Sequence, residues 1–181
     1  MSIKQEANQL LHDTGLLKLL EKYGEPHVTG SYLIDLMTWR DLDITVVNNQ
    51  PSPDILFALV HDVNTCVKPH RFDGVCRDGH YFFGCETQII GESWNIDIRF
   101  RSMAEHTKAL QYCDSIKQRI AVAPSLGKAI VEIKQALIRL NMYGLEKHPE
   151  RHYHSREIYD AVLNDGILTA EDFISKNPVN E

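Results

Sequence analysis

The chain has 181 residues, of which 43% are hydrophobic, so it can bury a core as one ordinary domain or as two small domains sharing an interface. Its formal net charge of -6 argues against a protein held on a long nucleic acid by bulk electrostatics, because such proteins usually present a basic face. The four cysteines form no Cys-x-x-Cys pair, and no apolar stretch resembles a leader or a membrane span. We therefore expect a cytoplasmic protein with reduced thiols and no membrane contact.

The first predicted elements are helical. Leucines recur at mostly helical intervals through residues 8–23, with Gly15 as a weak interruption. Residues 24–26, Gly-Glu-Pro, break this helix, and residues 27–29 form a short extended run. The pattern predicts one or two amphipathic helices followed by a first strand.

A glycine-serine turn comes next. Gly30 and Ser31 precede the apolar residues 33–37, whose spacing predicts a short helix with its N-terminus at Ser31. A helix N-terminus has unpaired N–H groups and a positive partial charge, so it binds phosphate readily. The glycine lets a ligand approach the backbone, and the serine hydroxyl can cap the helix or donate to an oxygen. An ordinary N-cap after a turn has the same appearance.

Two aspartates begin the second predicted strand. Residues 41–47 read Asp-Leu-Asp-Ile-Thr-Val-Val, and the two-residue period of a strand places Asp41 and Asp43 on one face. Two such carboxylates repel by about 1 kcal/mol in water and by more near a protein surface. Mg²⁺ is a natural compensating cation, because it prefers hard oxygen ligands. The alternative is a solvated strand end with Arg40 as the partner.

Helix and strand patterns then alternate. A helix is predicted from residue 53 to 63, an extended piece from 65 to 72, and a hairpin about residues 91–92 with arms at 80–90 and 93–100.

The second arm of that hairpin offers a third carboxylate. Its apolar and polar residues alternate cleanly, and Asp97 lies on the polar face. Asp97 completes an acidic group if this arm lies beside the Asp41–Asp43 strand. Two alternatives stay open: Asp97 forms only a same-face ion pair with Arg99, or Glu86 of the first arm is the third carboxylate.

Helical patterns fill the rest of the chain. Residues 102–120 and 124–143 predict two long helices, and two shorter ones follow at residues 154–163 and 169–175. The sequence therefore predicts an α+β fold, with a small mixed β-sheet and flanking helices in residues 1–101 and a helical C-terminal domain in residues 102–181.

Gly30-Ser31, the Asp41-x-Asp43 strand that follows after nine residues, and Asp97 in a later strand resemble the nucleotidyltransferase superfamily typified by DNA polymerase beta. The resemblance covers about the first hundred residues, and the helical half looks like the small bacterial members that modify antibiotics. It implies that residues 1–101 are a nucleotidyltransferase catalytic domain.

The resemblance also implies roles for these residues. Gly30 and Ser31 would hold the β- and γ-phosphates of a nucleoside triphosphate, with ATP foremost. Asp41 and Asp43 would bind Mg²⁺, and Asp97 would complete the second metal position or deprotonate the attacking hydroxyl. Two cations that flank an in-line displacement stabilise both the attacking and the leaving oxygen.

The activity implied is transfer of a nucleoside monophosphate to a hydroxyl of a small-molecule acceptor, for example a cationic aminoglycoside or a lincosamide. Lys128 could contact the triphosphate, although a solvated helix face is the alternative for this residue. A second interpretation of the chain is a non-catalytic binding or antitoxin-type module of the same fold. A third is a haloacid-dehalogenase-like phosphatase, which the apolar run after Asp41, rather than before it, disfavours. The sequence leaves the oligomeric state open.

Overall fold

The computed structural model describes residues 1–77, 79–89, 91–144 and 153–178. Contacts between residues divide the chain into two compact units, Met1–Cys113 and Asp114–Glu181. The division falls inside helix α5 (Met103–Val122), whereas the domain boundary expected from the sequence lies just before that helix.

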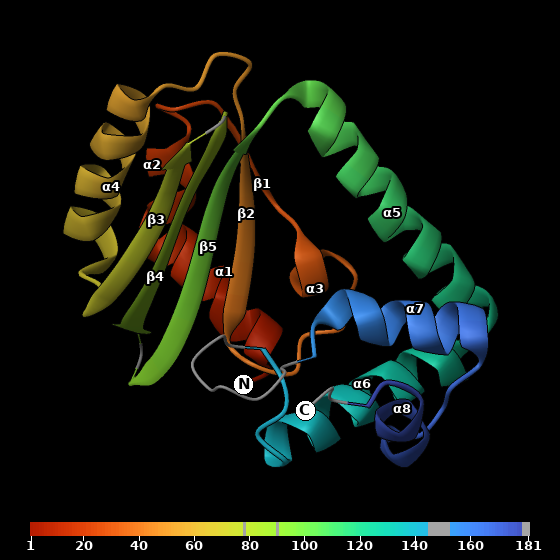
Figure 1. The fold of residues 1–181 in the computed structure, drawn as a ribbon. Helices are drawn as coiled ribbons and strands as arrows, with labels where there is room; N and C mark the ends of the chain where they lie inside the picture. The colour runs from red at the N-terminus through yellow and green to blue at the C-terminus, as the bar shows by residue number, and fades with distance from the viewer. Residues whose placement is uncertain (78, 90, 145–152, 179–181) are drawn as a thin grey trace. The chain divides into compact units, whose positions relative to one another are not determined.

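The first unit is built on a five-stranded mixed sheet with the strand order β1-β2-β5-β4-β3 (Figure 1). Strands β2 and β5 are parallel, and all other neighbouring pairs are antiparallel. The strands are β1 (Glu25–Val28), β2 (Asp41–Val47), β3 (Arg71–Arg77), β4 (His80–Ile89) and β5 (Glu92–Arg101). The expected α+β fold with a small mixed sheet is confirmed.

Three helices cover one face of this sheet (Figure 1). They are α1 (Ile3–Asp13), α2 (Leu16–Leu20) and α4 (Pro53–Val67). Alternate residues of the central strands, such as Leu42 in β2 and Ile96 in β5, are fully buried against them. Because strand side chains alternate, the intervening residues of β2 and β5 lie on the opposite face, where the polar positions gather.

The second unit is helical. Helix α6 (Pro124–Arg139) packs against α7 (Ser155–Asp165) and α8 (Ala170–Lys176). Ile130, Ile133 and Leu137 of α6 are fully buried, whereas Leu126 is half-buried and Leu140, just after the helix, is exposed. The Thr169 hydroxyl accepts a hydrogen bond from the Asp172 backbone N–H at 3.1 Å, which caps α8. In the described ranges of both units, no helix combines the length and apolarity needed to cross a bilayer.

Two local expectations were wrong. Helix α4 runs on to Val67, so the first part of the extended piece expected at residues 65–72 is helical, and β3 begins only at Arg71. The helix expected through residues 33–37 is the short α3 (Gly30–Leu33), because Asp35 adopts a positive φ of 59° that a helix cannot continue through. The apolar residues after it are nevertheless buried, which is why their pattern resembled a helix face.

Candidate active site

The parallel pairing of β2 with β5 brings the predicted acidic residues together. Asp43 lies directly opposite Asp97 in the sheet, and Asp41 lies opposite Asn95. All four positions belong to the face that α1, α2 and α4 leave uncovered. The adjacency of the two strands, which the sequence could not establish, is therefore present, and the chemical role of the carboxylates stays a prediction.

Arg99 bridges two of these carboxylates. Its Nη1 donates to Asp43 Oδ1 and its Nη2 donates to Asp97 Oδ2, each at 2.8 Å. An ion pair between Asp97 and Arg99 alone was one of the alternatives left open by the sequence. The structure has this ion pair, and it also places Asp97 beside Asp43. The bridge to Asp43 was not anticipated, because alternation along one strand says nothing about the neighbouring strand.

Asn95 is a second residue that sequence reasoning missed. Its Nδ2 donates to Asp41 Oδ1 at 2.7 Å and, more weakly, to Asp97 Oδ1 at 3.4 Å. An amide can donate to two carboxylates without adding charge, so Asn95 orients Asp41 while Arg99 orients Asp43 and Asp97. The alternation of Asn95, Asp97 and Arg99 along β5 was the available signal for this row of side chains.

The electrostatic state of Asp97 differs from that of an exposed aspartate. Burial raises the pKa of Asp97, the Arg99 guanidinium opposes that rise, and the nearby Asp43 carboxylate adds to it. Burial lowers the pKa of Arg99, but the carboxylates of Asp43 and Asp97 outweigh it and hold that pKa above its ordinary value. Three carboxylates face one guanidinium, so the group keeps an excess of negative charge once Asp97 is ionised.

The glycine-serine turn is fixed against this acidic group. The Thr29 backbone N–H donates to the Asp43 carbonyl at 2.8 Å. Gly30 has a φ of +61°, and a Cβ placed on it would lie 2.2 Å from Asp43 Oδ2. Only glycine allows this approach. The N-cap of α3 is Thr29, so the expectation that Ser31 begins and caps the helix was wrong; Ser31 is a buried residue inside α3.

Strand β4 borders β5 on the side opposite β2, and it leaves room there for the Asp97 side chain. Gly84 is paired with Asp97 in the sheet, and a Cβ on Gly84 would lie 3.2 Å from Asp97 Oδ1. Glu86, the alternative third carboxylate, is instead engaged by Arg71 at 3.4 Å and by His70 at 3.7 Å, toward the β3 edge. The contacts therefore favour Asp97 over Glu86.

Lys128 and its surroundings belong to the second unit. Lys128 is exposed and forms an i,i+4 ion pair with Glu132 at 3.7 Å, which suits a solvated helix face. Its contact with a triphosphate stays a prediction. Lys134, one turn and a half further along α6, is fully buried, and its Nζ lies about 5.5 Å from the ring centroids of Tyr143 and Tyr159. Nothing in the sequence pattern had marked Lys134.

The carboxylates have the ligand chemistry that Mg²⁺ requires, since they offer hard oxygens that already converge on one cationic group. In the arrangement seen here that group is the Arg99 guanidinium. No three His, Cys, Asp or Glu side chains in the described part of the chain are grouped closely enough to hold a metal ion. Arg99 occupies the position between Asp43 and Asp97, so metal binding by these carboxylates stays a prediction.

Comparisons with known proteins support the fold. No protein-family model and no curated protein sequence matches this chain. Among solved structures, the polymerase core of the RNA surveillance complex TRAMP matches with a TM-score of 0.64 and 19% identity over 86% of this chain and 47% of its own. The Cid1 poly(U) polymerase in its MgATP-bound form matches with a TM-score of 0.65 and 15% identity, covering 89% of this chain and 49% of its own.

The non-canonical poly(A) polymerase complex GLD-2–GLD-3 matches with a TM-score of 0.61 and 11% identity, covering 94% of this chain and 54% of its partner in the comparison. This chain thus spans about half the length of the solved structures it matches. The expected bacterial antibiotic-modifying type is not represented among these three and stays a prediction. At such identities the likeness concerns the fold, and the chain shares the fold of these nucleotidyl-transferring polymerases.

Proposed function

We propose that this protein transfers a nucleoside monophosphate from a nucleoside triphosphate, ATP foremost, to a hydroxyl of a small acceptor and releases pyrophosphate. One observation carries the proposal: Asp43 and Asp97 lie opposite each other in adjacent parallel strands, and the Gly30 turn is fixed against Asp43. The Cid1 poly(U) polymerase, which shares the fold, was solved with MgATP and with MgGTP, and this supports nucleotide use.

The turn at Gly30 would receive the phosphates of the donor. With no side chain at residue 30, the backbone comes within contact of the Asp43 carboxylate, so a phosphate on the turn and a cation on Asp43 would be neighbours. Asp41 and Asp43 would hold Mg²⁺, with Asp97 as the further ligand. When bound, Mg²⁺ supplies positive charge to the attacking and leaving oxygens of an in-line displacement.

Asp97 also suits the removal of a proton. In the transfer, the acceptor oxygen forms a bond to the α-phosphorus, the bond from that phosphorus to the bridging oxygen breaks, and the hydroxyl proton must leave. Burial raises the pKa of Asp97, so its carboxylate accepts a proton more readily than an exposed aspartate does. Asn95 and Arg99 keep this carboxylate oriented between the strands.

The test compares Asp43→Asn with Asp13→Asn, which removes the same charge from an exposed position on α1. ATP binding is measured by calorimetry with and without Mg²⁺. Pyrophosphate release is measured against a panel of hydroxylated metabolites that includes an aminoglycoside and a lincosamide. We expect Asp13→Asn to behave as the wild type and Asp43→Asn to lose Mg²⁺-dependent binding and release. Equal Mg²⁺-dependent binding in both variants would remove the proposed site.

One observation favours a second function, a non-catalytic binding module. Arg99 already forms ion pairs with both Asp43 and Asp97, so the acidic group is held together in the fold without a metal. A module of this kind would bind nucleotide equally well with EDTA and with Mg²⁺ and would release no pyrophosphate from any acceptor. The same calorimetry therefore separates the two functions.

A further inference from the structure

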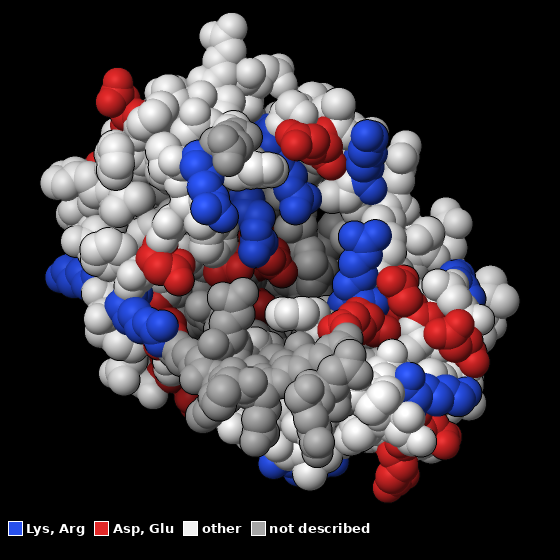
Figure 2. Space-filling view, viewed as in Figure 1, with Lys and Arg blue, Asp and Glu red and all other residues white. Residues whose placement is uncertain are grey.

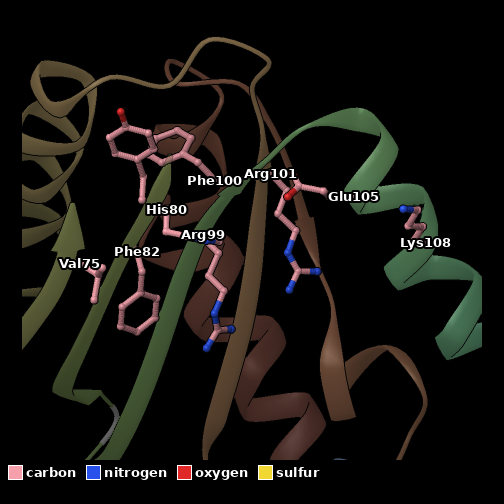
Figure 3. Close-up of a pocket in the computed structure, with 9 residues that line it drawn as sticks. Val75, His80, Phe82, Arg99, Phe100, Arg101, Glu105 and Lys108 are labelled. Carbon is pink, nitrogen blue, oxygen red and sulfur yellow. The ribbon is translucent and has the colours of Figure 1, made fainter. Parts of the chain in front are cut away.

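A cavity of about 590 Å³ opens beside the acidic group, over β4, β5 and the first turns of α5 (Figure 3). Side chains from all three elements line it, among them His80, Phe82, Arg99, Arg101, Glu105 and Lys108. Its volume lies in the range of small-molecule sites. All of its lining residues belong to the first unit.

The cavity adjoins Asp97 through Arg99, which lines the cavity and hydrogen-bonds the Asp97 carboxylate. Asp97, Arg99 and Arg101 occupy alternate positions of β5, about 7 Å apart along the strand, on one face of the sheet. Strand β5 has β2 and the turn on one side and β4 on the other. Figure 3 shows Arg99 and Arg101 projecting from β5 in the same direction, with Phe82 beside Arg99. The cavity therefore meets the acidic group at Arg99, whose Nη2 donates to Asp97 Oδ2 at 2.8 Å.

The cavity lining carries more positive than negative charge. Within the described residues, Arg101 and Lys108 form no salt bridge. The acidic lining residue Glu105 caps α5: it accepts hydrogen bonds from the Ser102 backbone N–H at 2.8 Å and from the Ser102 hydroxyl at 2.7 Å. These hydrogen bonds lower the pKa of Glu105, and the charge of Arg101 adds to this. Figure 2 shows basic side chains beside an acidic patch on this face. The concentration of cations is notable on a chain whose formal net charge is -6.

A flat apolar surface stands next to these cations. The Phe82 ring centroid lies 4.9 Å from the Arg99 guanidinium carbon, and Phe82 is paired with Arg99 in the sheet. This is a cation–π contact, and because both terminal nitrogens of Arg99 already donate to Asp43 and Asp97, the phosphate-binding cations of the cavity are Arg101 and Lys108.

We propose that this cavity holds the acceptor and selects one that carries a phosphate group. Arg101 and Lys108 bind the phosphate through charge-assisted hydrogen bonds, and the acceptor hydroxyl lies toward Asp97. The chemistry is that of a nucleoside monophosphate unit, whose ring has a counterpart in Phe82. A cationic aminoglycoside would meet a lining with an excess of cations and is disfavoured. The inference rests on the proposed function, because Asp97 must act on that hydroxyl.

The experiment uses the full chain in EDTA, so that metal-assisted binding at the Gly30 turn is absent. Calorimetry measures the affinity for adenosine 5′-monophosphate and uridine 5′-monophosphate in three proteins: the wild type, the double variant Arg101→Gln/Lys108→Gln, and the control Lys18→Gln/Lys68→Gln. The control removes two exposed cations from α2 and from the end of α4.

We expect the double variant to lose affinity by at least about 10-fold, the effect of losing charge-assisted hydrogen bonds, while the control matches the wild type. Adenosine without phosphate should bind equally weakly to all three proteins. A short oligoribonucleotide forms a further arm: tighter binding than the mononucleotide assigns the phosphate to a chain terminus, and equal or weaker binding assigns it to a free nucleotide. Circular dichroism melts show whether the double variant folds. If it does not fold, the single variant Lys108→Gln is measured in its place.

Mononucleotide binding that is equal in the double variant and the wild type overturns the inference, as does binding that is lost in Asp43→Asn alone. These outcomes differ from failure of the proposed function. If mononucleotides bind through Arg101 and Lys108 but Asp43→Asn leaves Mg²⁺-dependent ATP binding unchanged, the cavity stands as a phosphate site and the transfer reaction does not.

Discussion

The open face of the sheet has two ends of opposite charge. At one end Asp41, Asp43 and Asp97 form an acidic group, and at the other Arg101 and Lys108 line a cavity. Strand β5 contributes a residue to each end, Asp97 to the acidic end and Arg101 to the basic end. The acidic end repels phosphate unless a cation is added, whereas the basic end attracts phosphate by itself. We therefore expect phosphate binding at the acidic end to require a divalent cation and phosphate binding at the basic end not to require one.

The largest effect should come from Asp97→Asn, which removes the carboxylate at the junction of the two ends. We expect nucleotidyl transfer to fall by at least about 100-fold, as for loss of a general base, because the amide cannot accept the hydroxyl proton. Mononucleotide affinity in EDTA should stay at the wild-type level. Initial rates of pyrophosphate release measure the first effect and calorimetry the second. A parallel loss of both would mean that the two ends are not separate.

Gly30→Ala should damage the acidic end alone. A side chain there needs the left-handed φ of +61° and a Cβ 2.2 Å from Asp43 Oδ2, so we expect a loss of about 2–4 kcal/mol of stability in urea unfolding. Gly15→Ala is the matched control, because Gly15 also has a positive φ but no atom within 4 Å of its Cβ position. It should lose only about 1 kcal/mol. Equal losses would contradict the close approach of the turn to Asp43.

Arg99→Gln sharpens the comparison at the boundary between the two ends. It removes two charge-assisted hydrogen bonds and leaves Asp43 and Asp97 facing each other, so we expect a loss of roughly 1–3 kcal/mol in EDTA. Millimolar Mg²⁺ should restore more stability to this variant than to the wild type. Arg71→Gln, which breaks the edge ion pair with Glu86, should cost less than about 1 kcal/mol and show no response to Mg²⁺. Absence of a differential Mg²⁺ response would show that the carboxylates do not take a divalent cation in place of Arg99.

The smallest effect should be a pH dependence near the basic end. His106 of α5 is buried and stacks on His27 at a centroid distance of 4.2 Å. Burial lowers the pKa of His106, with His27 and Arg101 adding to this and Glu25 opposing it. The unfolded chain therefore takes up the proton more readily, so stability is full above pH ~6.5 and declines as the pH falls below it.

Thermal melts between pH 8 and pH 5 measure this dependence. His106→Leu should flatten the decline in Tm relative to the wild type, and His12→Gln, at an exposed position, should leave it unchanged. A steeper decline in His106→Leu would reverse the assigned sign.

Much of the fold followed from local pattern. Strand β2 has the expected bounds, because alternation from Asp41 onward is regular, and the β4–β5 hairpin follows from two long alternating arms. The end of α4 and the shortness of α3 could not be predicted: a buried apolar residue has the same signature whether its backbone is helical or not.

The candidate site was predictable only in part. Spacing and residue type identified Asp41, Asp43 and Asp97, but their adjacency depends on pairing between strands more than fifty residues apart, which no local pattern encodes. The same limit hid the reach of Arg99 across to Asp43. The cavity could not be predicted from the sequence for a further reason. It forms where β4, β5 and α5 meet, and each of these elements contributes only one or two polar residues that no motif marks.

Gly84 has a consequence for how this site can vary. Residue 84 adds no side chain beside Asp97, and the Phe82 ring lies against it: a Cβ at residue 84 would lie 2.9 Å from Phe82 Cζ and 3.2 Å from the Asp97 carboxylate. Glycine is already the smallest residue, so mutation at this position can narrow the approach to Asp97 and cannot widen it. Acceptors with a bulkier group at the reacting hydroxyl would therefore require substitutions at other residues around the cavity. The size of the side chain at residue 84 is already at its minimum.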